Sequence, residues 1–209
     1  REPPPASHHH DHAVYNVTMN PPLPDTTPFF PDWPLPPYTY IPGHGPHPIR
    51  DPAGHSHGIA PEPAVPLTPD NWPHSRPYLR GFDLFNAGCY WEAHEIWESC
   101  WIASGRTGTT ADFLKGLIKL AAAGVKVREQ NTTGSHRHVR RARELFNSVR
   151  SSSVRSSGQE SGSSDEAFLG VSFAHLDLAA MALETCTDVP APSDPPRPLL
   201  TFALQPARP

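Results

Sequence analysis

Apolar residues recur at helical spacing in five segments of the chain, all of them between residues 75 and 184. Positions three or four apart share one face of a helix, so each segment predicts an amphipathic helix with one buried face. No segment in this window alternates apolar and polar residues as a half-buried strand would. The pattern therefore predicts an all-α fold, a small up-and-down bundle of about five helices. The expected helices cover residues 75–88, 90–102, 111–127, 135–150 and 167–184.

Capping and turn residues set the expected helix boundaries. Ser75 fits the N-cap of the first helix, with Pro77 in its first turn, and Gly88 fits its end. Thr109 or Thr110 should cap the third helix. Turns are expected at residues 105–108 and 131–134, and a flexible Ser/Gly-rich insert at residues 151–165.

The distribution of proline separates this window from both ends of the chain. The chain has 28 prolines in 209 residues, and none lies between Tyr78 and Val189. A helix interior excludes proline, because the ring removes a donor and clashes with the preceding turn. We therefore expect a Pro/His-rich extension over residues 1–73, a helical domain over 74–186 and a Pro-rich tail over 187–209, with both ends largely irregular.

Charge and cysteine usage narrow the protein class. The formal net charge of -4 does not by itself predict a polyanion partner. The three cysteines are odd in number and form no C-x-x-C pair, which disfavours a disulfide scaffold and favours a reducing, cytoplasmic compartment. No apolar run reaches transmembrane length, so a membrane partner is not expected.

The second expected helix carries the chemistry. His94 and Glu98 lie four residues apart and share a face, and they have the types and spacing of two ligands for zinc or a similar divalent metal. Glu95 follows His94 directly, as the catalytic Glu does in an H-E-x-x-H helix. The same side of the helix is expected to present a set of aromatic residues to the ligand: Tyr90, Trp97 and Trp101.

A structural alternative remains open for this helix. His94 and Glu98 can form a pair that closes a polar gap in the core, with the tryptophans as packing, since aromatic stripes at helical spacing are usually core. Glu92 and Glu95 point away from His94 on the helical wheel, and we expect both to be solvated.

Two stretches of the sequence resemble a known family. Residues 84–98, Leu-Phe-Asn-Ala-Gly-Cys-Tyr-Trp-Glu-Ala-His-Glu-Ile-Trp-Glu, and residues 113–122 are similar to the domain of unknown function 309 family. His94, Glu98 and Trp101 match its recurring motif, His-x-x-x-Glu-x-x-Trp/Tyr. The resemblance covers about residues 74–150 and implies a bacterial or archaeal helical domain whose motif is suggested to bind metal.

Two lysines depart from the family pattern. Many members have Gln where this chain has Lys115 and Lys119. A lysine near a metal would compete with it electrostatically, and either lysine could instead neutralise Glu98.

Histidines in the extension form a second candidate cluster. They have His-x-x-His and His-x-His spacing in a turn-rich segment, and such spacing can chelate zinc. The alternative is a surface loop whose imidazoles cap turns, and an intermediate possibility is a loop that lends a ligand to His94. The four residues are His44, His47, His55 and His57.

The fourth expected helix is basic and could bind phosphate. Residues 126–155 carry eight Lys or Arg against Glu129 and Glu144. Arg137, Arg140 and Arg141 could hold phosphate groups, although a solvated basic face is the commoner explanation and no base-reading motif accompanies them.

The sequence thus favours a helical domain that binds a divalent metal or a small ligand at the His94 face. If it is an enzyme, metal-assisted hydrolysis with Glu95 or Glu98 as proton acceptor is the natural reaction class. The competing interpretation is a non-enzymatic module that binds phosphate, RNA or a protein partner through the basic helix. In that case the His–Glu pair is structural, and nucleic acid is the least expected of these partners.

Overall fold

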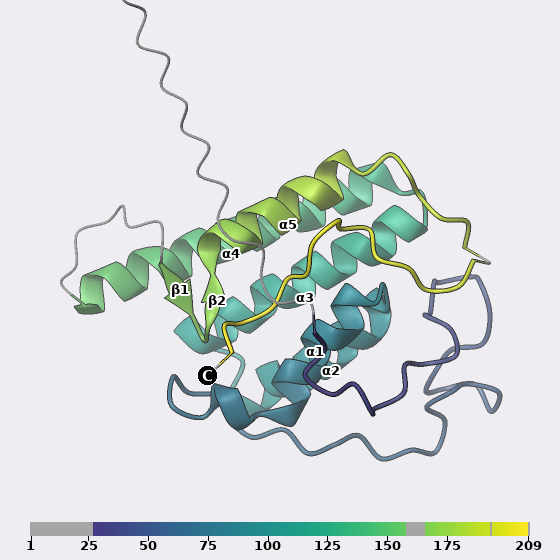
Figure 1. The fold of residues 1–209 in the computed structure, drawn as a ribbon, viewed down its shortest axis with the longest axis horizontal. Coiled ribbons are helices and arrows are strands. Elements are labelled where there is room, and N and C mark those ends of the chain that lie inside the picture. The colour runs from purple at the N-terminus through teal and green to yellow at the C-terminus, as the bar shows by residue number, and fades with distance from the viewer. Residues whose placement is uncertain (1–26, 158–165, 193, 209) are drawn as a thin grey trace, which may run out of the picture.

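Five α-helices form the body of the part of the chain that the structure describes (Figure 1). The structure, a computed structural model, describes residues 27–157, 166–192 and 194–208. The elements in chain order are a 3-10 turn at Trp72–His74, α1 (Arg76–Asn86), α2 (Tyr90–Ala103), α3 (Thr109–Arg128), α4 (Thr132–Ser157), β1 (Ala167–Phe168), β2 (Val171–Ser172) and α5 (Phe173–Thr185). Helices that follow one another in sequence pack against one another, and α5 also contacts α3. The predicted all-α bundle is confirmed.

The start and end of α1 follow from local chemistry. Ser75 occupies the N-cap position and Pro77 lies in the first turn, although no hydrogen bond from the Ser75 side chain caps the helix. Gly88 takes a positive φ of 83°, which glycine adopts without strain. A Cβ on Gly88 would also collide with the backbone carbonyl of Arg197 in the tail. Both the backbone angle and this close contact therefore require glycine after α1.

Three boundaries differ from the sequence prediction. Gly108, not Thr109 or Thr110, is the N-cap of α3. Helix α4 begins at Thr132 and continues to Ser157, so the first part of the predicted flexible insert is helical, and residues 158–165 lie outside the described residues. The long, regular helix continues into the serines because they carry no breaker before Gly158.

The last expected helix was predicted six residues too early. A two-stranded antiparallel hairpin, with Ala167 opposite Ser172, precedes α5. Leu169 and Gly170 turn this hairpin with φ values of 46° and 78°, the pair of positive angles that a tight two-residue hairpin turn requires. Two residues per strand are too few for an alternating pattern to be visible in the sequence.

The core is built around aromatic side chains of α1 and α2. Phe82 packs edge-on against Trp97 with ring centroids 5.0 Å apart, and Phe85 packs in the same way against Tyr90 at 5.1 Å. All four side chains are at most 1% exposed. Such aromatic contacts stabilise beyond the area they bury, by roughly 0.5–1.5 kcal/mol per pair. They fix the angle at which α2 crosses α1 and so fix the orientation of the opposite face of α2.

The irregular ends pack on the helices. The amides of Phe29 and Phe30 donate to the two carboxylate oxygens of Asp83 at 2.8 and 3.0 Å. In the tail, the Asn86 amide group donates to the Leu204 carbonyl and accepts from the Leu204 amide, both at 2.9 Å. Figure 1 shows the tail, in yellow, running across the helices. The described parts of the extension and of the tail are largely irregular, as predicted, and both pack on the helices.

Candidate metal centre on helix α2

Three potential metal ligands lie together on α2. His94, Glu95 and Glu98 each offer one ligand atom, and these atoms lie within 4.8 Å of one another. His94 Nδ1 is 3.3 Å from Glu95 Oε1. Two ligands at about 2.1 Å from a tetrahedral zinc would stand roughly 3.4 Å apart. All three side chains are half-buried.

The polar atoms at this position are incompletely satisfied. His94 Nδ1 is buried and makes no hydrogen bond, because Glu95 Oε1 approaches it without hydrogen-bond geometry. The indole Nε1 of Trp101, on the same side of the helix, is also buried without a partner. A buried imidazole nitrogen without a hydrogen bond costs free energy, which an ion or a ligand group at this position would recover.

Two of the predicted ligand-face aromatics lie elsewhere. Trp97 is fully buried, and its indole nitrogen donates to the Tyr78 carbonyl at 3.1 Å. Tyr90 is also buried, and its hydroxyl accepts the amide of Leu199 from the tail at 2.8 Å. Burial raises the pKa of Tyr90 well above its ordinary value. The structure therefore places Trp97 and Tyr90 in the core, and Trp101 alone of the three stays beside His94.

The two lysines of α3 line the other side of this face. Lys115 Nζ stands 5.5 Å from the centre of the Trp101 ring, a cation–π contact. Burial first, and then the charges of Lys115 and Arg141, lower the pKa of Lys119, while the nearby Glu98 carboxylate opposes that change. Neither lysine forms an ion pair with Glu98 in the described part of the chain. Direct neutralisation of Glu98 is thus not what the structure shows.

The basic side of α4 adjoins the same region. Burial first, and then the charges of Lys119, Arg137, Lys126 and His94, lower the pKa of His138 to about 4. The two candidate sites of the sequence, on α2 and on α4, are therefore electrostatic neighbours across α3.

Most of the α4 arginines are already paired. Arg141 lies 2.8 Å and Arg140 4.0 Å from Glu144, so one carboxylate serves both arginines. Arg143 pairs with Glu184 of α5 at 2.7 Å. Arg137 makes no ion pair within the described residues, and of the three predicted phosphate ligands it is the one left without a carboxylate.

The comparison with protein families bears on this helix. Residues 78–138 match the family model named Domain of unknown function (DUF309). The match runs from α1 into α4, and residues 78–138 are called the DUF309 segment below. No curated protein and no solved structure matched the chain. The match confirms the resemblance inferred from residues 84–98 and 113–122, and the DUF309 segment contains His94, Glu98 and Trp101.

Two glutamates of this segment were misjudged from sequence. Glu95 was expected to point away from His94 into solvent, yet its Oε1 lies 3.3 Å from His94 Nδ1 and its side chain is half-buried. Glu92 was expected to be solvated, yet it is only 7% exposed. Its carboxylate accepts hydrogen bonds from the Thr39 hydroxyl at 2.7 Å and the Tyr40 amide at 3.0 Å, and it lies 3.2 Å from His55 Nε2. Apolar residues on most sides of α2 were the available signal, because a helix that is apolar nearly all round is buried nearly all round.

The extension histidines do not gather into a metal site. In the part of the chain that the structure describes, His94, Glu95 and Glu98 are the one group of three or more potential metal ligands. His55 pairs with Glu92, and His47 Nδ1 accepts the amides of Ile49 and Arg50. His57 Nδ1 donates to the Ile49 carbonyl, and the His44 amide donates to the Ile41 carbonyl. These partners are those of a loop that docks on α2, and no imidazole of the loop joins His94.

The cysteines of the DUF309 segment offer no nucleophile. Cys89 and Cys100 are buried, and burial raises the pKa of each thiol to about 12. A thiol with such a pKa is almost entirely protonated at neutral pH.

No helix in the described residues is long and apolar enough to span a membrane.

Proposed function

We propose that the DUF309 segment of this chain binds a divalent transition metal, zinc or a similar ion, with His94 and Glu98 as ligands and Glu95 beside them. The observation that carries the proposal is the buried Nδ1 of His94, which makes no hydrogen bond and lies near the carboxylates of Glu95 and Glu98 on the same helix. Imidazole and carboxylate are a donor set suited to zinc.

The charges around the cluster modify its affinity. Two carboxylates favour a cation, and Lys115 and Lys119 weaken that preference. The metal would therefore bind less tightly than at a site without lysines, and the same lysines would attract an anionic group to the ion. If the site is catalytic, the ion would activate water and Glu95 would accept the proton, which is metal-assisted hydrolysis.

Metal content tests the proposal directly. The full chain is purified without a tag, supplemented with zinc, dialysed, and measured by elemental mass spectrometry, together with His94→Ala and Glu98→Gln. His57→Ala and Glu144→Gln are matched controls, because they remove a histidine and a glutamate outside the cluster. We expect about one equivalent in the wild type and in both controls, and its loss in both cluster variants.

Two results would oppose the proposal. Metal retained in both cluster variants would place the ion elsewhere. A wild type without metal after supplementation, with both cluster variants merely less stable, would reduce His94 and Glu98 to a packing pair.

The second candidate function is phosphate or RNA binding through α4, supported by the unpaired Arg137 next to Lys119. It predicts binding of an RNA oligonucleotide that weakens steeply with added salt and is lost in Arg137→Gln, but is kept in Arg143→Gln, whose arginine is already paired with Glu184.

A further inference from the structure

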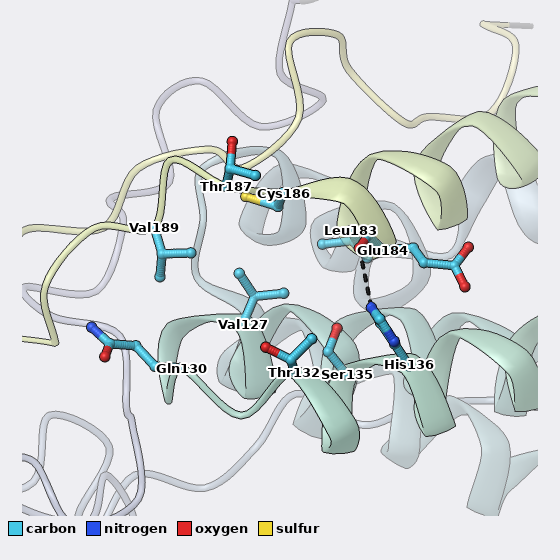
Figure 2. A pocket seen from close by; sticks show the side chains of 10 residues that line it. All are labelled: Val127, Gln130, Thr132, Ser135, His136, Leu183, Glu184, Cys186, Thr187 and Val189. Atoms are coloured by element: carbon cyan, nitrogen blue, oxygen red, sulfur yellow. Dashed lines mark hydrogen bonds between the residues drawn. The ribbon is translucent and has the colours of Figure 1, made fainter.

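A cavity of about 450 Å³ lies at the end of the bundle, where α3 ends, α4 begins and α5 runs into the tail. It shares no residue with the His94 cluster, and its size is that of a small-molecule site. Figure 2 shows its walls, with α4 below and the end of α5 and the tail above. Apolar side chains form one part of the lining: Val127, Leu183 and Val189.

The polar part of the lining contains an unsatisfied hydroxyl. Ser135 is 1% exposed, and its Oγ is buried without a hydrogen-bond partner. In Figure 2 this hydroxyl points from α4 toward the space below the end of α5. A serine in a helix usually satisfies its hydroxyl with the carbonyl four residues earlier, so a buried serine that does not do so has its donor available for another group.

The backbone at the same end of α4 also supplies a free donor. The side chain and carbonyl of Asn131 accept the amides of Gly134 and Ser135, at 2.8 and 2.9 Å. The amide of Thr132, which lines the cavity, has no partner among the described residues. The N-terminal end of a helix of 26 residues carries a partial positive charge that favours an anion.

The backbone carbonyl and the carboxylate of Glu184, at this end of the bundle, both have partners. A carbonyl can only accept, so His136 Nε2 carries its proton and donates it to the Glu184 carbonyl at 3.2 Å. The Glu184 carboxylate points away from the cavity in Figure 2 and accepts from Arg143 Nη1 at 2.7 Å.

We propose that this cavity binds the oxyanion group, carboxylate or phosphate, of a small molecule. The Ser135 hydroxyl, the Thr132 hydroxyl and the Thr132 amide hold the oxyanion. The apolar part of the molecule packs against Val127, Leu183 and Val189. The buried Ser135 hydroxyl lacks a hydrogen bond while the cavity is empty, which costs free energy. A bound oxyanion would supply that hydrogen bond.

Amide chemical shifts of the full-length, isotopically labelled protein test the proposal. The protein is titrated to millimolar concentration with inorganic phosphate, with isovalerate, and with chloride at matched ionic strength. We expect saturable shifts at Thr132 and Ser135 with at least one of the two oxyanions and not with chloride. Response to phosphate alone or to isovalerate alone identifies which oxyanion the site prefers.

Variants separate binding from a structural role. Ser135→Ala and Thr132→Val should abolish the saturable shifts, while Thr133→Val, the matched control outside the cavity, should keep them. Ser135→Ala should also raise the melting temperature of the ligand-free protein, because it removes a buried hydroxyl that has no partner. No saturable response to either oxyanion, shifts that persist in Ser135→Ala, or a lower melting temperature in that variant would overturn the proposal.

Discussion

Removal of the Glu92 carboxylate should uncouple the N-terminal extension from the helices. This side chain is the buried acceptor for three groups of the extension, the Thr39 hydroxyl, the Tyr40 amide and His55 Nε2. Glu92→Ala leaves these groups facing apolar surface with nothing to accept their protons. Glu92→Gln keeps the shape, removes the charge and turns one acceptor oxygen into a donor.

The expected magnitudes follow from the number and type of these bonds. A hydrogen bond to a charged acceptor contributes about 1.5–3 kcal/mol, and loss of one partner of a buried ionic contact costs about 3–5 kcal/mol. Because the three bonds share one carboxylate, their energies do not add. We expect Glu92→Ala to lower the free energy of unfolding by about 3–5 kcal/mol, and Glu92→Gln by about half as much.

Urea unfolding monitored by tryptophan fluorescence and circular dichroism measures both effects. Fluorescence also reports the extension itself, because Trp91 packs edge-on against Tyr40 with ring centroids 5.4 Å apart. Glu144→Gln is the matched control, since Glu144 forms only exposed ion pairs, and it should change stability by less than about 0.5 kcal/mol. If Glu92→Ala unfolds within about 0.5 kcal/mol of the wild type, the extension is not held by this carboxylate and the reasoning fails.

Two further changes test the core and the α3–α4 face. Gly81→Ala places a Cβ against the indole nitrogen of Trp97, and we expect a net loss of about 1–3 kcal/mol in urea unfolding despite the better helix propensity of alanine; equal or higher stability would show that Trp97 moves freely. Burial and neighbouring cations lower the pKa of His138 from 6.5 to about 4, so the folded state resists its protonation. Its stabilising effect is complete above pH 6.5 and is lost as the pH falls toward 4. Over that range metal-free wild type should lose about 1 kcal/mol more than His138→Gln, a value reduced for the half-exposed ring, and parallel pH curves would contradict this.

The helices were predictable because their determinants are local. Pro77 and Gly88 bound α1 by backbone chemistry alone, and the spacing from Phe113 to Gly124 defines the buried face of α3. The hairpin before α5 depends on a positive φ at Leu169, and leucine rarely adopts a positive φ, so the sequence contains no sign of this turn.

The candidate site was predictable only in part. His94 and Glu98 could be paired from their spacing, because one helix determines their relation. The place of Glu92 could not be derived in the same way, since its partners are more than fifty residues away in a segment without periodicity. Tyr90 and Trp97 were assigned to the ligand side because the helical wheel does not say where the neighbouring helices lie. That position depends on the packing of α1 and on the tail, whose Leu199 amide meets the Tyr90 hydroxyl.

The Asn86 side chain forms the same pair of hydrogen bonds with the Leu204 backbone that a peptide group of a neighbouring strand would form. It donates one hydrogen bond to the Leu204 carbonyl and accepts one from the Leu204 amide. Two residues that face each other in an antiparallel sheet exchange hydrogen bonds in the same way. A single amide on a helix thus substitutes for a partner strand that the fold lacks at this place. It also sets the alignment of the tail to one residue: a deletion between α5 and Leu204 would present the wrong peptide unit to Asn86. The length of that Pro-rich segment is therefore constrained, although its sequence shows no helix or strand pattern.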